Sequence, residues 1–239
     1  MDAEVPPPGA LVVLPVQGIG EVRPGDDLAG AIAAAAHLAD GDVVVVTQKV
    51  VSKAEGRLVR VDPDDPEAKL RLAESEAVRV LRRRGDLVIT ETRHGFVCAN
   101  SGVDLSNVDE GVAALLPVDP DRSARRLRDA LVGRLKIAVA VVVTDTFGRA
   151  WRRGVTDVAI GCAGIAAVLD LRGTKDANGR ELRATEVCVA DEIAAAADLV
   201  MGKAARCPVA IVRGLSPGWW RESSVRAEVV RSPGEDLFR

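Results

Sequence analysis

The 239-residue sequence contains no tyrosine, and its three phenylalanines and three tryptophans make up only 3% of the chain. The core must therefore be built from Val, Ala, Leu and Ile, which dominate the 48% of residues that are hydrophobic. A chain this apolar, with 28% charged residues, is typical of a globular protein and not of a disordered one. Its longest apolar runs are shorter than the ~20 residues that a membrane-spanning helix requires.

Cysteine is scarce, and the chain has no overall excess of positive charge. The four cysteines, at positions 98, 162, 188 and 207, lie far apart without a CxxC pair, which argues against a zinc site and favours reduced, buried thiols. The N-terminus lacks a signal-peptide pattern. With 32 basic and 35 acidic residues the net charge is −3, so no basic surface for nucleic acid or membrane is expected. These features predict a cytoplasmic protein with neither as a partner.

Two common nucleotide-binding motifs are also missing. The loop Gly18–Val22 begins like GxGxxG, but Arg23 stands at the position of the last glycine. No GxxxxGK[ST] sequence occurs anywhere in the chain. A nucleotide site, if present, must therefore differ from the dinucleotide fingerprint and from the P-loop. Likewise, no Ser/His/Asp or Cys/His arrangement indicates a catalytic triad.

The apolar pattern predicts an α+β protein with mixed or antiparallel sheets and flanking helices, because several expected strands follow one another directly. Residues 1–10 are expected to be a flexible lead-in, and residues 11–239 a single domain, open to division into two lobes. Strands are expected at 11–16, 43–46, 57–61, 86–92, 95–98, 137–143, 155–160, 166–171, 187–189 and 209–212. Helices are expected at 28–39, 67–84, 121–135 and 191–202, with a short one after Thr47.

Two acidic loops are the first candidates for chemistry. Asp145 and Thr146 follow the most apolar expected strand and precede Arg149, Arg152 and Arg153, which are suited to binding phosphate. Asp104 lies in a second short loop, 101–107. By themselves these segments also fit a capped turn with a solvated basic face and an Asx turn. Taken as a pair, the two segments suit a hard cation, because such ions are commonly held by two carboxylates and bridge to phosphate oxygens.

Two other polar positions have simpler interpretations. The segment 47–53 carries Lys49 and Lys53 at a helix start, an arrangement suited to an anion, although an ordinary N-cap with solvated lysines is favoured when it is taken alone. His94 is expected to be a structural turn residue rather than a proton shuttle.

Four long stretches together carry a family resemblance. GDVVVVTQKVVSKAEGR, HGFVCANSGVDLSNV, VVVTDTFGRAWRRGVTDVAIG and ADEIAAAADLVMGKA, in this order, resemble the coenzyme F420:L-glutamate ligase (F420-0:γ-glutamyl ligase) family. The resemblance implies a family-specific α+β ligase fold in an intertwined homodimer. It also implies GTP, L-glutamate and a deazaflavin coenzyme precursor as substrates. The implied ions are Mg²⁺ or Mn²⁺, two per site, with K⁺ as a further candidate.

The resemblance assigns roles to individual residues. Asp104 and Asp145 match metal-binding catalytic aspartates, and Thr146 matches a ligand of the second metal. Lys53 matches a catalytic and nucleotide-binding position. The other implied nucleotide contacts are Ile19, Gly20, Glu21, Val22, Gln48 and Asn107. Lys203 stands where archaeal members carry Gln; if that Gln supports the second metal, this chain would need another ligand such as water.

The implied reaction is ligation through an acyl phosphate. The acceptor carboxylate takes the γ-phosphoryl group of GTP, and the amine of glutamate then displaces phosphate to form an amide. No nitroreductase-like domain, which some bacterial relatives carry, is recognised in the sequence. Two alternatives remain: a GTP-binding regulatory module without turnover, and a ligase that acts on a different carboxylate.

Overall fold

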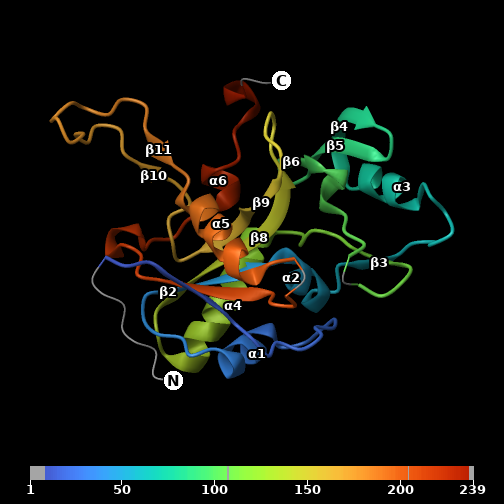
Figure 1. Ribbon diagram of the computed structural model, residues 1–239, viewed down its shortest axis with the longest axis horizontal. Coiled ribbons are helices and arrows are strands. Elements are labelled where there is room, and N and C mark those ends of the chain that lie inside the picture. The colour runs from blue at the N-terminus through green and yellow to red at the C-terminus, as the bar shows by residue number, and fades with distance from the viewer. Residues whose placement is uncertain (1–8, 107, 204, 237–239) are drawn as a thin grey trace.

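The structure is a computed structural model that describes residues 9–106, 108–203 and 205–236 (Figure 1). The expected lead-in, residues 1–10, falls almost wholly outside these ranges. The helices are α1 (Leu28–Ala35), α2 (Gln48–Ala54), α3 (Ala68–Ser75), α4 (Pro120–Leu135), α5 (Val189–Met201) and α6 (Val225–Glu228). The strands are β1 (Val12–Pro15), β2 (Asp42–Thr47), β3 (Leu58–Arg60), β4 (Ala77–Arg84), β5 (Leu87–Thr92), β6 (Val97–Ala99), β7 (Val112–Ala114), β8 (Val139–Gly148), β9 (Val155–Ala163), β10 (Leu169–Asp170), β11 (Glu186–Val187) and β12 (Val209–Arg213).

A five-stranded mixed sheet forms the centre of the molecule, in the order β1-β12-β2-β8-β9. Strands β2 and β8 pair in parallel from Asp42↔Val139 to Thr47↔Thr144, and the other neighbours are antiparallel. The α+β class with mixed sheets is therefore confirmed. Strand β8 extends to Gly148, so the Asp145 segment, expected in a loop, lies within a strand that pairs with β9.

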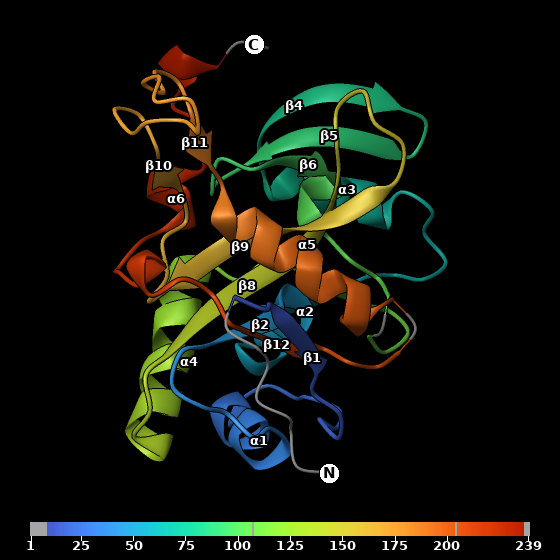
Figure 2. The ribbon, with the colours of Figure 1, turned by 60° about the vertical axis from the view of Figure 1, so that its left-hand side comes forward.

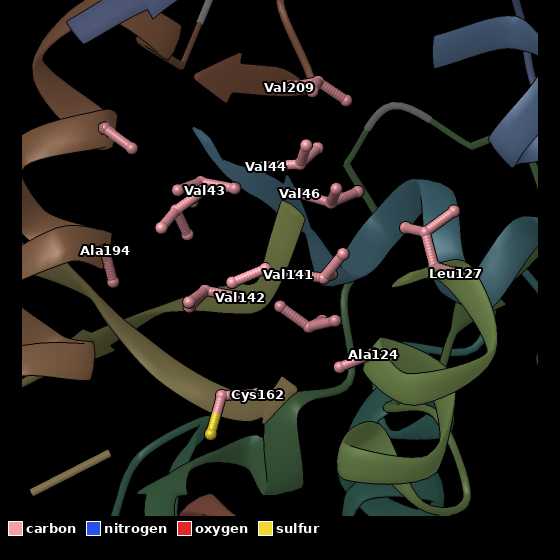
Figure 3. Packing of buried hydrophobic residues seen from close by; sticks show 14 of the residues in the cluster. Val43, Val44, Val46, Ala124, Leu127, Val141, Val142, Cys162, Ala194 and Val209 are labelled. Atoms are coloured by element: carbon pink, nitrogen blue, oxygen red, sulfur yellow. The ribbon is translucent and has the colours of Figure 1, made fainter. Parts of the chain in front are cut away.

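Helices cover both faces of this sheet. Figure 3 shows Val43 on the side of Ala194 in α5, whereas Val44 and Val141 lie on the side of Leu127 in α4. Because successive side chains of a strand point to opposite faces, a strand covered on both sides needs a continuous apolar run. The run Val43–Val46 meets this need, and all four of its residues are fully buried.

A smaller unit lies to one side of the central sheet (Figures 1 and 2). It contains the antiparallel sheet β4-β5-β6, the pair β3-β7 and helix α3. Its own hydrophobic cluster consists of Ala73, Val88, Val103, Ala113 and Leu115, with partly buried residues around it. The described residues thus divide their buried apolar side chains between two clusters.

The prediction of a helix over residues 67–84 is wrong for its second half. Helix α3 ends at Ser75, and Ala77–Arg84 forms strand β4, paired antiparallel with β5. The apolar residues of this segment fit a helical period, but pairing with β5 decides the outcome. Arg79, for example, forms an ion pair with Glu91 across the two strands, at 2.9 Å. The preference of a segment for a strand depends on such cross-strand partners, which the apolar pattern of that segment alone does not reveal.

Other boundaries differ by a few residues. Helix α1 ends at Ala35, four residues before the expected end. The expected strand 166–171 is reduced to the short β10, and α5 begins at Val189, inside the expected strand 187–189. None of the helices in the described ranges is long and apolar enough to cross a membrane.

The buried carboxylate of Asp121 joins three elements around the sheet. Its Oδ1 atom accepts hydrogen bonds from the backbone N–H groups of Cys162 and Val225, both at 2.9 Å. Its Oδ2 atom accepts from Ser224 Oγ at 2.8 Å and from the N–H of Arg226 at 3.1 Å. Hydrogen bonds to a charged acceptor are the strong ones, so this carboxylate holds the start of α4 against β9 and α6.

We expect Asp121→Asn to lower the free energy of unfolding by about 2–4 kcal/mol, because the NH₂ group of the amide would face N–H and O–H groups that now donate to the carboxylate. Urea denaturation measures this change. Asp129→Asn, an exposed change on the same helix, is the control and should stay within about 0.5 kcal/mol of wild type. Equal stability of the two variants would contradict the role of Asp121.

Candidate active site at the ends of two parallel strands

The parallel pairing of β2 and β8 brings their carboxyl ends to one edge of the sheet. Thr47 and Thr144 face each other in the register, so the residues that follow them start from adjacent points. After Thr47 the chain turns into α2, and Thr47 Oγ1 accepts a hydrogen bond from the N–H of Lys49 at 3.3 Å. After Thr144, β8 continues with Asp145. Segments about 100 residues apart in sequence thus meet where open sheets often bind ligands.

The smaller sheet contributes Asp104 to the same edge. Phe96, directly before β6, contacts Phe147 of β8, and their rings meet edge to face at 6.1 Å between centroids. In β6, burial raises the pKa of Cys98 to about 12, and the negative charge of Asp145 adds to this rise. The chain after β6 therefore enters the region of Asp145, and it reaches Asp104 six residues beyond Cys98.

The backbone before Asp104 adopts an unusual conformation. Asn100, Ser101 and Gly102 all have positive φ, of 51°, 54° and 70°. Left-handed backbone is uncommon for residues other than glycine and is found most often where surrounding contacts impose it. Here the N–H of Ser101 donates to Thr90 Oγ1 at 3.0 Å, and Ser101 Oγ donates to the carbonyl of Ala73 at 2.6 Å. These bonds hold the tight turn that aims the following loop at β8.

Lys49 anchors Asp104 within the site. Its Nζ atom lies 2.9 Å from Asp104 Oδ2 and donates to Ser106 Oγ at 2.7 Å. Asp104 Oδ1 also accepts from the N–H of Ser106 at 2.6 Å, the Asx turn expected as the simpler interpretation of this loop. Burial acts to raise the pKa of Asp104, but the bonds from Lys49 and Ser106 outweigh it and leave that pKa below its usual value. Asp104 is therefore charged at neutral pH.

Among the residues that the structure describes, Asp145 has no comparable partner. Burial raises its pKa to about 7, and the negative charges of Asp104 and Asp157 add to this rise. The N–H of Thr146 and the more distant charge of Lys203 oppose it without cancelling it. The two candidate metal ligands thus lie close enough to repel each other, and Asp145 is the one whose charge lacks compensation.

The opposite face of β8 carries a separate polar cluster. Thr144, Thr146 and Asp157 share that face, because alternate residues of β8 point the same way and Thr146 pairs with Asp157 on β9. Asp157 is 3% exposed; its Oδ2 accepts from Thr144 Oγ1 at 3.0 Å and its Oδ1 from Thr146 Oγ1 at 2.6 Å. Lys203, just beyond α5, contacts Thr146 and lies 3.0 Å from Asp157 Oδ1.

The predicted nucleotide contacts gather around α2. Lys53, 7% exposed, forms an ion pair with Glu21, which ties the loop of residues 19–22 to this helix. Gln48 is 1% exposed, and its side-chain carbonyl accepts a hydrogen bond from Ser52 Oγ at 2.9 Å. Asn107 lies outside the described residues. The expectation of solvated lysines at this helix start is wrong, because Lys49 and Lys53 both form ion pairs.

Other candidates lie apart from this cluster or have structural partners. Arg149, Arg152 and Arg153 are exposed at the tip of the β8–β9 hairpin, beyond the end of β8. His94 is confirmed as a structural residue of the β5–β6 turn: Nε2 is 2.9 Å from the carbonyl of Pro117 and Nδ1 is 3.3 Å from Thr92 Oγ1. Burial also lowers the pKa of His94 below its usual value.

The side chains at this edge fit a hard divalent cation. Asp104 and Asp145 offer carboxylate oxygens, and the uncompensated burial of Asp145 is what a bound cation would relieve. In the described part of the chain, no three His, Cys, Asp or Glu residues form a complete metal cage. Mg²⁺ typically binds through one or two carboxylates plus water and substrate phosphates, and Mn²⁺ accepts the same oxygen ligands. The pair of aspartates therefore suits an ion whose remaining ligands are water or phosphate oxygens.

Sequence reasoning missed several members of the cluster. Asp157 has no motif of its own and becomes recognisable only through the register of β9 against β8. The partner of Lys49 was equally hidden, because Asp104 is 55 residues away in sequence. A carboxylate pair lies beside two lysines where the parallel pairing of β2 and β8 ends. This arrangement defines the class of the site, which is suited to phosphate chemistry with a divalent ion.

Comparison with known proteins identifies the family. The sequence model of the family described as F420-0:Gamma-glutamyl ligase matches residues 18–214. The chain is 45% identical to the Coenzyme F420:L-glutamate ligase of Methanopyrus kandleri, over 96% of this chain and 98% of that protein. Proteins of the same name from Archaeoglobus fulgidus and Methanothermobacter thermautotrophicus are 42% and 39% identical, over 95% and 96% of this chain and 96% and 99% of their own. The chain belongs to the F420-0:gamma-glutamyl ligase family, which confirms the resemblance seen in the sequence.

The raised pKa of Asp145 predicts a stability that falls with pH. Between pH about 4 and 7 the folded protein keeps a proton that the unfolded chain has lost, so raising the pH through this window lowers the free energy of unfolding. Asp145→Asn stays neutral. We expect it to be more stable than the wild type by about 2–4 kcal/mol at pH 8, and to lose this advantage near pH 4.

Urea denaturation of both metal-free proteins at pH 4, 6 and 8 measures this difference. Asp129→Asn is the matched control, since Asp129 is exposed and its substitution should leave the pH dependence unchanged. A stability difference for Asp145→Asn that does not change with pH would contradict the raised pKa.

Proposed function

We propose that this protein catalyses the GTP-dependent addition of L-glutamate to the carboxylate of a deazaflavin precursor of coenzyme F420. Membership of the F420-0:gamma-glutamyl ligase family supports this activity, as do the relatives named Coenzyme F420:L-glutamate ligase. The observation that carries the proposal is the uncompensated Asp145 beside Asp104 at the ends of β2 and β8. Two partly buried carboxylates close to each other are a costly arrangement that a metal–nucleotide ligand would stabilise.

The proposed reaction has two steps. A carboxylate does not condense with an amine at neutral pH without activation, because hydroxide is a poor leaving group. In the first step an oxygen of the acceptor carboxylate bonds to the γ-phosphorus of GTP, and the bond from that phosphorus to the β–γ bridging oxygen breaks, which releases GDP. In the second step the glutamate nitrogen bonds to the acyl carbon and phosphate leaves. The products are an amide, GDP and phosphate.

The residues at the site would chiefly position substrates and balance charge. Asp104 and Asp145 would hold Mg²⁺ or Mn²⁺, which neutralises charge on the transferring phosphoryl group. Lys53, next to the loop of residues 19–22, would offer its ammonium group to the phosphates of GTP. Lys49 would hold Asp104 in a charged, fixed position.

We assign no side chain as the base for the amine of glutamate. His94 is held by Thr92 and by the carbonyl of Pro117, and its lowered pKa reflects burial in that turn. The proton would instead pass to the departing phosphate or to solvent.

Incubation with GTP, L-glutamate, the deazaflavin precursor and Mn²⁺ tests the proposal. GDP release that requires both the precursor and glutamate would support it, as would loss of turnover after chelation of the metal. Nucleotide binding without turnover would instead support a GTP-binding regulatory module. Turnover with another acid, identified by mass spectrometry of the products, would support a ligase for a different carboxylate.

Asp145→Asn should abolish the metal-dependent reaction, with GDP release reduced about 100-fold or more. The same variant is expected to be more stable than the wild type at pH 8, so a loss of activity would not reflect unfolding. The assay compares it with Asp129→Asn, which should retain wild-type turnover. Near-normal turnover of Asp145→Asn at saturating Mn²⁺ would contradict the assignment.

We also propose that the protein acts as a homodimer. Trp151 at the tip of the β8–β9 hairpin is 84% exposed, and Val155 on the same hairpin is 60% exposed. Tryptophan is enriched in protein interfaces because a large apolar ring is costly to leave in water. We expect Trp151→Glu to shift the wild-type dimer to monomer in sedimentation velocity. A dimer that persists in this variant would contradict the role of the hairpin.

A further inference from the structure

Lys203 provides a positive charge on the face of β8 opposite Asp145. Its ammonium group contacts Thr146 Oγ1 and lies 3.0 Å from Asp157 Oδ1 and 3.5 Å from Asp198 Oδ1. Thr146 is the residue that the family resemblance suggests as a ligand of a second metal ion. The structure thus shows a predicted ligand of a divalent ion already in contact with a cation that belongs to the chain.

Both carboxylate oxygens of Asp157 have hydrogen-bond partners within the chain, without an added ion. Its two oxygens accept from the hydroxyls of Thr144 and Thr146, and Lys203 supplies the opposite charge. The carboxylate is 3% exposed, so it needs such partners to remain buried. A divalent ion at Thr146 would lie next to the ammonium group, and the two positive charges would repel each other.

The geometry of β8 separates this cluster from Asp145. Successive side chains of a strand point to opposite faces, so Asp145 and Thr146 do not face the same side of the sheet. Asp145 faces the side of α2 and the loop of Asp104, whereas Thr146 faces Asp157 and Lys203. On the face of Asp145, Lys49 pairs with Asp104, and Asp145 is the carboxylate left without a close cation among the described residues.

We propose that the ammonium group of Lys203 serves as a built-in cation at Thr146 and Asp157, so that the site takes one divalent ion, held by Asp104 and Asp145. Lys203 is a positioning residue, because it fixes the hydroxyl of Thr146 and the carboxylate of Asp157 behind the strand that carries Asp145. This inference rests on the proposed metal-dependent function. It differs from the expectation of two divalent ions per site and of water at the second position.

The number of Mn²⁺ ions bound per chain tests this assignment. Mn²⁺ is titrated into nucleotide-free protein, and free Mn²⁺ is followed by its electron paramagnetic resonance signal. We expect one bound ion for the wild type. Lys203→Gln removes the charge and leaves an oxygen donor beside Thr146, so it should bind two. Lys203→Arg keeps the charge and should bind one, as should the control Lys175→Gln, which changes an exposed lysine away from this cluster.

The outcomes separate this inference from the proposed function. Two ions in the wild type, or a single ion in Lys203→Gln, would overturn the role of Lys203 while leaving the metal-dependent function standing. No bound ion in any of the four proteins would overturn metal binding by Asp104 and Asp145, and this inference with it. Thermal unfolding shows that each variant is folded, and the 58% exposure of the Lys203 side chain makes its replacement mild.

Discussion

The parallel pairing of β2 with β8 is the constraint on which the rest of the site depends. It aligns Thr47 with Thr144, so that α2, which carries Lys49 and Lys53, begins beside the segment that carries Asp145. Parallel strands place their carboxyl ends together, and both strands must then be apolar enough for burial on two faces. The fully buried valines of β2 and β8 meet this requirement, so the core and the site arise from the same pair of strands.

Electrostatics then distinguishes the two aspartates. Asp104 receives the ammonium of Lys49 and the N–H of Ser106, which keep it charged, whereas Asp145 is half-buried beside other acids, without a close cation among the described residues. An uncompensated buried carboxylate reduces the stability of the free protein. Sites that bind a charged ligand commonly accept such a cost, because the ligand restores the balance. The destabilised residue is in this sense the clearest structural indication of function.

The alternation of β8 also divides the polar side chains by role. One face directs Asp145 toward Asp104, and the other directs Thr144 and Thr146 toward Asp157 and Lys203. Each face contains a lysine, but Lys203 contacts both Asp157 and Thr146, whereas Lys49 pairs with Asp104 and leaves Asp145 without a close cation among the described residues. A family resemblance can suggest that neighbouring residues share a ligand. The two-residue period of a strand, however, determines which side chains point to the same face of the sheet.

The sequence alone determined the α+β class, most strands and helices, and the family, because buried β-branched runs, helix caps and long matching segments are local signals. It also singled out Asp104 and Asp145 as candidate metal ligands. It could not determine that residues 77–84 form β4, since the apolar residues of this segment also fit a helical period and only the pairing with β5 decides between helix and strand. Nor could it show that Lys49 pairs with Asp104 or that Lys203 reaches Thr146. Those contacts join segments more than 50 residues apart, and only the packing of the two sheets brings their charges together.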